Sequence, residues 1–253
     1  MHPLLLEIAH RTAPLSREPW VSMQTWNDLL FAHWKYPVDE LRKLVPAELE
    51  LDLFEGAAYV GVVPFWMSGV RGRFMPPIPG VHTFPELNVR TYVRVNGIPG
   101  VYFFSLDAAS RVAVWGARLT YHLPYFFAEM AVHNVGTKVH YKSRRQEPPA
   151  PADFQGLYWP TGAVKQEKSA LESFLSERYC LYTVHRGRTY RAYIHHLPWA
   201  LQPAGAELDT LTVAKAQGLE LPQERPLLHF SRKLDVLIWP IQRVQAAPGA
   251  ATC

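Results

Sequence analysis

The sequence predicts a mainly β protein with a few short helices, folded as one large antiparallel β-barrel or sandwich. Three observations favour this class. Runs rich in β-branched and aromatic residues recur along the chain, as in "YVGVVPFW", "LNVRTYVRV" and "VYFFSLD". Only three short segments show clear helical signals, and turns with Gly or Pro separate most of the runs. The chain has 253 residues, 48% of them hydrophobic, which is enough for a sizeable core.

The elements expected in the first part of the chain follow from turn residues and periodicity. Prolines bracket a short amphipathic segment, and an Asn-Gly pair closes a polar strand. In order we expect a strand over 24–36, a helix over 37–46, two strands within 49–70 with a turn at Glu55-Gly56, a Gly/Pro/Arg-rich loop over 71–82, a strand over 83–95 and its hairpin partner over 101–107 across a loop of about five residues.

The second part is predicted in the same way. Ser169 and Glu172 form a capping box, and Gly218 has the position of a helix C-cap. In order we expect a strand over 112–123, a short irregular or helical turn and a further strand up to 145, a Pro-rich loop over 146–154, a helix over 169–179, a hairpin over 179–196 around Gly187, a helix over 206–219 and a final strand over 227–244.

One domain is expected over residues 21–245, because the chain contains no long linker and no internal repeat. Residues 1–20 are predicted to form a loose or docked N-terminal arm, and residues 246–253 a disordered tail. The apolar run "PLLLEIA" is too short for a secretory signal or a membrane span. Cys180 and Cys253 do not suggest a disulfide scaffold, so we expect a cytoplasmic protein with no membrane partner.

An unusual strand face occurs within "TFPELNVRTYV". Glu86, Asn88, Arg90 and Tyr92 alternate with nearly apolar residues, so a strand would place them on one face. The backbones of Glu86 and Arg90 would lie about 13 Å apart, which is too far for a simple salt bridge. Each side chain therefore needs water, a cross-strand partner or a ligand.

Two interpretations of this face stay open. The polar face could simply meet solvent, as in many antiparallel sheets. Alternatively, the expected strand over 112–123 presents Arg118, Thr120 and His122 on one face, and two polar strand faces side by side would line the inside of a barrel. An unpaired charge there costs several kcal/mol, so it must be paired or offered to a ligand. We favour the cavity.

Several function classes lack their usual signals. The sequence contains no GxGxxG, P-loop or GxSxG motif, and its eleven histidines form no metal-ligand spacing, so we predict neither cofactor nor metal. The net charge is only +4. The densest basic cluster, over 138–144, alternates as a solvated strand face would, so no nucleic-acid partner is expected.

The chain resembles a known family in five blocks that occur in family order: "HWKYPVDELRKLVPAELELDLFEGAAYVGVVPFWMSGVR", "FPELNVRTYV", "ARLTYHLPY", "LSERYCLY" and "LHFSRKLDVLIWP". They are similar to the DUF2071, or YqjF-like, family of uncharacterised bacterial proteins, from about Thr25 to Val244. That family resembles the acetoacetate decarboxylases, which implies a large antiparallel β-barrel with an internal pocket.

The same resemblance bears on chemistry. In the decarboxylases a lysine forms a Schiff base with a β-keto acid, and a strand glutamate assists. Glu86 matches that glutamate, whereas Tyr125 and Phe126 stand where the lysine is expected. No lysine lies between Lys43 and Lys138. The resemblance thus implies the fold and the cavity without the Schiff-base nucleophile.

The predicted function is the binding of a small organic acid or carbonyl compound in an internal pocket. A second form of this hypothesis adds a chemical reaction of the bound compound. Glu86 is the catalytic acid/base candidate, since burial shifts a carboxyl pKa. The predicted ligand-binding residues are Arg90, Asn88, Arg118, His122, Tyr121, Tyr125 and His33, with an arginine gripping a carboxylate. The competing hypothesis is a non-enzymatic assembly or regulatory module. The sequence leaves open the ligand, whether a reaction occurs and whether the chain forms a homo-oligomer.

Overall fold

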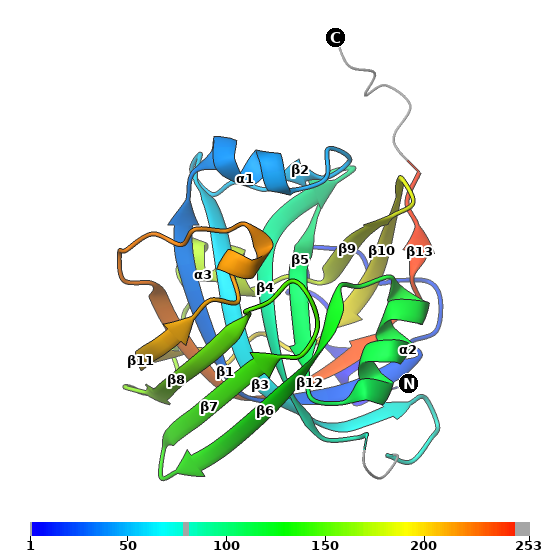
Figure 1. The fold of residues 1–253 in the computed structure, drawn as a ribbon. Coiled ribbons are helices and arrows are strands. Elements are labelled where there is room, and N and C mark those ends of the chain that lie inside the picture. Colours follow the sequence, from blue (N-terminus) through cyan, green and yellow to red (C-terminus); the bar gives the residue numbers. More distant parts are fainter. Residues whose placement is uncertain (1, 78–80, 246–253) are drawn as a thin grey trace.

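The computed structural model describes residues 2–77 and 81–245 (Figure 1). The tail predicted for 246–253 and part of the loop predicted for 71–82 lie outside these residues. The elements are η1 (Pro3–Leu6), β1 (Ser22–Tyr36), α1 (Val38–Leu44), β2 (Glu50–Leu51), β3 (Ala58–Gly72), β4 (Phe84–Val95), β5 (Ile98–Ala108), α2 (Arg111–Tyr121), β6 (Tyr125–Val135), β7 (Lys138–Arg145), β8 (Asp153–Pro160), α3 (Ala170–Ser176), β9 (Cys180–His185), β10 (Arg188–His195), β11 (Gln202–Leu211), η2 (Lys215–Gln217), β12 (Leu227–Ile238) and β13 (Gln242–Arg243).

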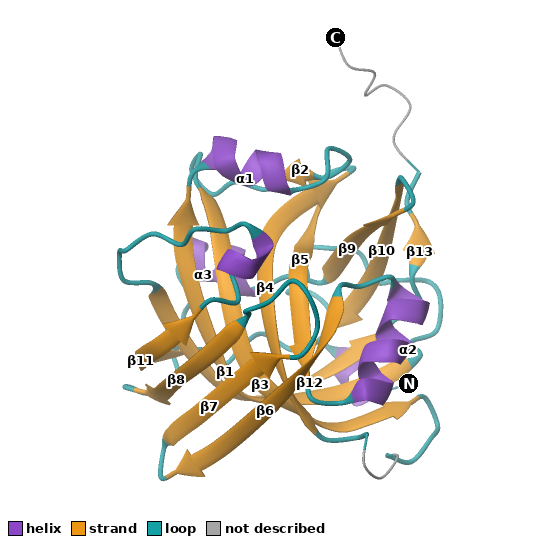
Figure 2. Cartoon of the chain, in the orientation of Figure 1, coloured by secondary structure: helices purple, strands orange, loops and turns teal. Residues whose placement is uncertain are grey.

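The strands form a single closed sheet, which confirms the mainly β prediction (Figure 2). Their order is β13-β10-β9-β5-β6-β7-β8-β11-β12-β1-β3-β4-β2, and the further pairings β10–β12 and β5–β4 close it. The pairings are antiparallel except β5–β6 and β5–β9. The sheet therefore makes two adjoining rings, which share β12, β1, β3, β4 and β5.

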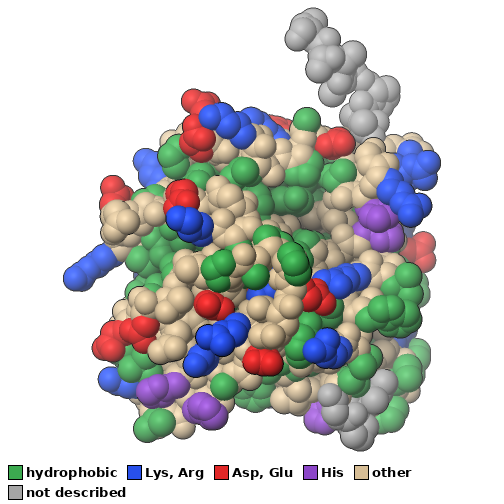
Figure 3. All heavy atoms as spheres, in the orientation of Figure 1, with side chains coloured by type: hydrophobic (Ala, Val, Ile, Leu, Met, Phe, Trp, Pro, Cys, Tyr) green, Lys and Arg blue, Asp and Glu red, His purple; other side chains and the backbone are tan. Residues whose placement is uncertain are grey.

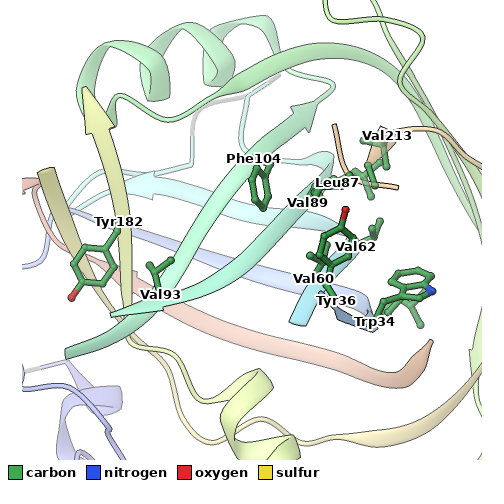
Figure 4. Close-up of a cluster of buried hydrophobic side chains, with 14 of the residues drawn as sticks. Trp34, Tyr36, Val60, Val62, Leu87, Val89, Val93, Phe104, Tyr182 and Val213 are labelled. Atoms are coloured by element: carbon green, nitrogen blue, oxygen red, sulfur yellow. The ribbon is translucent and has the colours of Figure 1, made fainter. Parts of the chain in front are cut away.

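Among the shared strands, β4 is buried on both faces over most of its length. On one face of β4, Leu87, Val89 and Val93 pack into the hydrophobic core enclosed with β7 and β8 (Figure 4). The opposite face of β4 carries the polar residues and looks into the other ring, where a second hydrophobic cluster lies. The alternation in the sequence thus separates two compartments rather than a core from solvent.

The hairpin between β4 and β5 is tighter than predicted. Asn96 and Gly97 both have positive φ, 51° and 76°, and form a two-residue turn. This geometry suits the twist of paired antiparallel strands, and asparagine and glycine are the residues that adopt it most readily. The turn signal was correct, whereas the expected loop of about five residues was too long.

Two of the three predicted helices form. Helix α1 lies between its prolines, and α3 begins with the Ser169–Glu172 capping box. The helix predicted over 206–219 is wrong, because residues up to Leu211 pair with β8. Only the 3-10 turn η2 follows, with Gly218 at φ 78° as its C-cap. Tertiary pairing overrides the helical propensity of this segment.

The strand predicted over 112–123 is also wrong, because this segment forms helix α2. The Ser110 hydroxyl accepts a hydrogen bond from the Ala113 amide at 3.3 Å and caps the helix. Val112, Trp115 and Leu119 recur at helical spacing on its exposed face. The valines and the tryptophan favoured a strand locally, whereas the cap and this spacing favoured a helix.

The N-terminal arm is docked rather than loose. Leu4, Leu5 and Leu15 pack against the core, and the Trp239 indole donates to the Glu18 carbonyl at 2.6 Å. Within residues 2–77 and 81–245, no helix has the length and apolar character needed to cross a membrane. Basic and acidic side chains are interspersed over the face in Figure 3. Lys138, His140, Lys142 and Arg144 of β7 are exposed and alternate with buried residues, as predicted, whereas Arg145 at the end of the strand is buried.

Candidate functional site

A cavity of about 240 Å³ lies inside the ring that contains β9 and β10, against the polar face of β4. Most of the side chains around it are apolar. Its lining comprises Ser22, Gln24, Trp26, Leu29, Val63, Phe65, Met67, Val70, Phe84, Glu86, Asn88, Arg90, Val101, Phe103, Leu106, Ala113, Ala117, Thr120, Tyr121, Leu123, Tyr125, Ser176, Arg178, Leu181, Ile194, His196, Trp199 and Ile238. A cavity with a few polar groups in an apolar wall is typical of small-molecule sites.

The structure brings Glu86, Asn88 and Arg90 together along this cavity. Their exposed fractions are 2%, 5% and 8%, so none of them meets bulk solvent. Each has an apolar neighbour in register on β5, namely Ala108, Leu106 and Phe103. The neighbours on β3 are Phe65, Val63 and Gly61. The three residues therefore form a narrow polar strip, which we call the β4 strip, within a mostly apolar wall.

Glu86 lies at one end of the β4 strip. The Tyr125 hydroxyl donates to its Oε2 at 2.8 Å, and no other side chain among the described residues pairs with it. Burial raises the pKa of Glu86 to about 8, partly opposed by the Tyr125 hydrogen bond. Glu86 is thus mainly protonated at neutral pH and carries a proton beside the cavity.

Asn88 is in the middle of the strip. Its amide makes no hydrogen bond within the described part of the chain, and its Oδ1 is fully buried. A buried amide without partners costs free energy, since each unmade hydrogen bond leaves a desolvated group. Asn88 therefore offers the cavity both a donor and an acceptor.

Arg90 is at the other end. Its guanidinium donates to the Leu175 carbonyl at 3.2 Å and lies 5.1 Å from the Phe31 ring centroid. Its buried Nε has no hydrogen-bond partner, and no carboxylate pairs with Arg90 within residues 2–77 and 81–245. Arg90 thus brings a positive charge to the cavity wall that no described acid neutralises.

Two other buried arginines, Arg145 and Arg178, each have a carboxylate partner, as expected of an arginine with a structural role. Arg145 pairs with Asp107 at 2.7 Å, and both side chains have no exposed surface. Arg178, which also lines the cavity, pairs with Asp52 at 2.5 Å. Each of these guanidinium groups has a carboxylate, as buried charges require. Arg90 differs from both.

Helix α2 forms the wall opposite part of β4. Ala113, Ala117 and Tyr121 recur every four residues along its inner face, and Thr120 lies beside them. The small alanines keep this side of the cavity open. The Tyr121 hydroxyl donates to the Trp239 carbonyl at 3.2 Å, so Tyr121 anchors the wall.

Three predicted ligand-binding residues, Arg118, His122 and His33, do not line the cavity. Arg118 lies on the outer side of α2, where it pairs with Glu147. His122 caps α2 in a left-handed conformation and stacks on His185, with ring centroids 4.2 Å apart. Placing both on an inward strand face was wrong, because the helix turns these side chains away.

His33 lies next to the Arg90 end of the β4 strip and does not line the cavity. Its Nε2 is 2.6 Å from the Tyr92 hydroxyl, which also donates to the Leu175 carbonyl at 2.7 Å. Burial lowers the pKa of His33 well below its usual value, and the nearby Arg90 lowers it further. His33 is therefore a neutral support for the strip, and its Nδ1 has no partner in the described residues.

Sequence reasoning missed some lining residues. Arg178, His196 and Trp199 come from segments more than eighty residues beyond β4 in the chain, and only the closed sheet brings them to it. The Pro-rich segment before β4 and the period-two pattern within β4 located only the β4 strip. No local signal in the sequence identifies these three.

The donor set limits the chemistry of this site. No lysine lines the cavity among the described residues, so the site offers no amine for a Schiff base. Nor does the described part of the chain contain a group of three or more His, Cys, Asp or Glu side chains arranged to hold a metal ion. The groups offered are a neutral acid, an amide and a guanidinium, which suit hydrogen bonding and proton transfer.

Comparisons with known proteins agree with the fold and add no established activity. The model of the DUF2071 family, described as an uncharacterized conserved protein, matches residues 23–235. The uncharacterized protein YqjF of Bacillus subtilis (strain 168) is 49% identical over 225 residues, which cover 88% of this chain and 93% of YqjF.

Solved structures with the same fold are much more distant in sequence. Acetoacetate decarboxylase from Legionella pneumophila has a TM-score of 0.60 at 15% identity, over 92% of each chain. The enduracididine biosynthesis enzyme MppR complexed with pyruvate has a TM-score of 0.59 at 11% identity, over 92% of this chain and 93% of MppR. These likenesses confirm the expected acetoacetate decarboxylase-like fold.

Proposed function

The chain belongs to the DUF2071 family of uncharacterised conserved proteins, and we propose that its cavity binds a small organic acid, with the carboxylate on Arg90. The observation that carries this proposal is the buried guanidinium without a carboxylate partner in the described residues. A charge in such a place is unfavourable until an anion neutralises it. A carboxylate is the natural counterpart, because a guanidinium can donate two parallel hydrogen bonds to it.

The rest of the β4 strip supports a second polar group on the ligand. The Asn88 amide and the protonated Glu86 follow Arg90 at strand intervals, each about 6.5–7 Å along β4. A carbonyl or hydroxyl group of the ligand would meet them while its carboxylate stays on Arg90. The pyruvate bound in MppR, a protein of the same fold, is an acid with a carbonyl group.

A reaction at this site would use Glu86 as acid or base. Its pKa of about 8 lies close to neutral pH, where a proton donor and its conjugate base are both accessible. Tyr125 holds the carboxyl group through its 2.8 Å hydrogen bond. Decarboxylation through a Schiff base is not part of this proposal, because the described lining offers no lysine.

The alternative of a non-enzymatic module receives less support. It needed the β4 strip to face solvent or a partner, whereas all three residues are buried. An assembly role would have to use another surface, such as the exposed apolar side of α2 (Figure 3). We place the protein in the reducing cytoplasm, in keeping with the free, buried thiol of Cys180.

A thermal-shift screen of organic acids and carbonyl compounds tests the proposal. A ligand at a hundred times its Kd adds about 2.7 kcal/mol of stability. For a domain of this size that raises the melting temperature by roughly 5–10 °C. The proposal expects acids to give such shifts and their uncharged amides to give much smaller ones.

A matched pair of variants separates the cavity from general charge effects. Arg90→Met removes the buried cation, whereas Arg188→Met removes an exposed cation that does not line the cavity. We expect the acid-induced shift to fall to about half or less in Arg90→Met and to persist in full in Arg188→Met. Equal shifts in both variants would contradict the proposal.

A further inference from the structure

The inference below rests on the proposed function and extends it to the class of ligand. We infer that the ligand is an acid with an apolar chain, whose carboxylate binds Arg90 and whose chain runs along β4 to an apolar end beside helix α2. The inner face of α2 then sets the length of chain that fits. This makes Ala113 and Ala117 specificity-determining residues.

The first support is the order of side chains along β4. Phe84, Glu86, Asn88 and Arg90 line the cavity in sequence, so it changes from apolar to cationic along a single strand. Three strand intervals separate Phe84 from Arg90, which is about 20 Å of backbone. Met67 lies in register with Phe84 and extends the apolar end onto β3. A ligand lying along β4 would therefore meet a polar end and an apolar end.

The second support is whether the polar atoms at each end of the cavity have hydrogen-bond partners within the protein. Around Arg90 and Asn88, buried polar atoms have no partner in the described residues. At the α2 end, the hydroxyl groups of Ser22, Thr120 and Tyr121 all donate to backbone carbonyls, at 3.2, 2.7 and 3.2 Å.

These hydroxyl groups already donate to the protein backbone, so the surface that the α2 end presents to a ligand is mainly apolar. Gln24 and Trp26 are exceptions there, since the Gln24 amide makes no hydrogen bond and the buried Trp26 indole N–H has no partner within the described residues. Val70, Phe84 and Ile238 complete the apolar surface. A polar ligand group placed here would lose its water without gaining equivalent hydrogen bonds, whereas an apolar chain would gain from leaving water.

The third support is the size of the side chains on α2. The residues that face the cavity at Ala113 and Ala117 are small, although α2 carries large apolar residues on its exposed side, at Val112, Trp115 and Leu119. A leucine at either alanine would project into the cavity, because both positions lie on the lining face one turn apart. The space beside α2 is thus a consequence of two specific residues.

The test is a titration of straight-chain carboxylates, from acetate to decanoate, followed by NMR chemical shifts so that weak binding is measurable. In the wild type, each added methylene should tighten Kd by about fourfold, until the chain reaches α2. Longer chains should then bind more weakly. Ala117→Leu should move the optimum to shorter chains and leave acetate and propionate unchanged.

Controls separate the possible failures. Leu119→Ala changes the outer side of α2 and should keep the wild-type length profile. Ala113→Leu repeats the narrowing at a second position, in case one variant folds poorly in thermal melts. An unchanged optimum in both leucine variants, or a Kd independent of chain length, overturns this inference while leaving acid binding intact. Absence of binding by every acid overturns the proposed function itself.

Discussion

Replacing Arg90 with methionine should weaken acid binding while hardly changing the stability of the ligand-free protein. Methionine keeps much of the length of the side chain and removes its charge. In the free protein the guanidinium donates to the Leu175 carbonyl at 3.2 Å and to the Tyr92 hydroxyl at 3.4 Å. That carbonyl keeps Tyr92 as a donor and that hydroxyl keeps His33, so the two lost hydrogen bonds cost about 1–2 kcal/mol. Removing an unneutralised buried charge offsets this loss.

The expected magnitudes can be compared with a second arginine in the same sheet. Arg145→Met leaves Asp107 without its partner in a place with no exposed surface, which should cost about 3–5 kcal/mol. For a domain of this size, that lowers the melting temperature by roughly 6–20 °C, whereas Arg90→Met should stay within about 4 °C of the wild type. Loss of a charge-assisted hydrogen bond, about 1.5–3 kcal/mol, should raise the Kd for an acid by roughly ten- to a hundredfold.

The assay is a pair of measurements on wild type, Arg90→Met and Arg145→Met. Thermal melts without ligand give the stability, and calorimetric titration with the tightest acid from the screen gives Kd. A melting temperature of Arg90→Met as low as that of Arg145→Met would show that Arg90 is a structural residue. Unchanged acid affinity in Arg90→Met would refute the assigned role as well.

Four further predictions follow from the same geometry. Because the pKa of Glu86 is raised to about 8, the folded state holds a proton that the unfolded state loses above about 4.5, so the free energy of unfolding falls as pH rises between these values. Glu86→Gln should remove this fall, as measured by urea denaturation at each pH. Parallel pH dependences of stability in the wild type and the variant would contradict the prediction. Tyr125→Phe removes a hydrogen bond that favours the carboxylate, so the carboxyl NMR titration of Glu86 should move to higher pH; a shift to lower pH would be inconsistent. Borohydride reduction with acetoacetate should leave the mass of the protein unchanged, and an adduct on any lysine would disprove this. Elemental analysis after purification without metal affinity should find no stoichiometric zinc or iron, since the described residues form no ligand group; one equivalent of either metal would overturn the prediction.

The β4 strip could be located from the sequence because strand alternation is a local rule. Once residues 83–95 form a strand, Glu86, Asn88 and Arg90 must share a face, and their spacing excludes a mutual salt bridge. What alternation does not determine is the environment of that face. The burial of all three residues depends on β9 and β10, which close the ring much later in the chain.

Helix α2 shows where local reasoning failed. Val112, Val114 and Trp115 have strand propensity, and the prediction of a strand did not consider Ser110 as a helix cap. The error carried Arg118 and His122 into the predicted site. The prediction for residues 206–211 was wrong in the opposite sense: a helix was predicted, but pairing with β8 holds these helix-favouring residues in a strand.

Pairing between distant charges was beyond any local pattern. Asp52 and Arg178 are 126 residues apart in the chain, yet they form one buried ion pair. Arg90 stands out only by comparison with such pairs, because the sequence does not show which arginine lacks an acid. The candidate for ligand binding is therefore a property of the folded protein.

A crystal structure of the protein with the tightest-binding carboxylic acid would test the central claim most directly. The account predicts that the acid occupies the cavity beside β4, with a carboxylate oxygen within hydrogen-bond distance of the Arg90 guanidinium, including its unpaired Nε. The rest of the ligand should extend past Asn88 and Glu86 towards Phe84. An acid bound outside this cavity, or bound inside it with its carboxylate away from Arg90, would contradict the account.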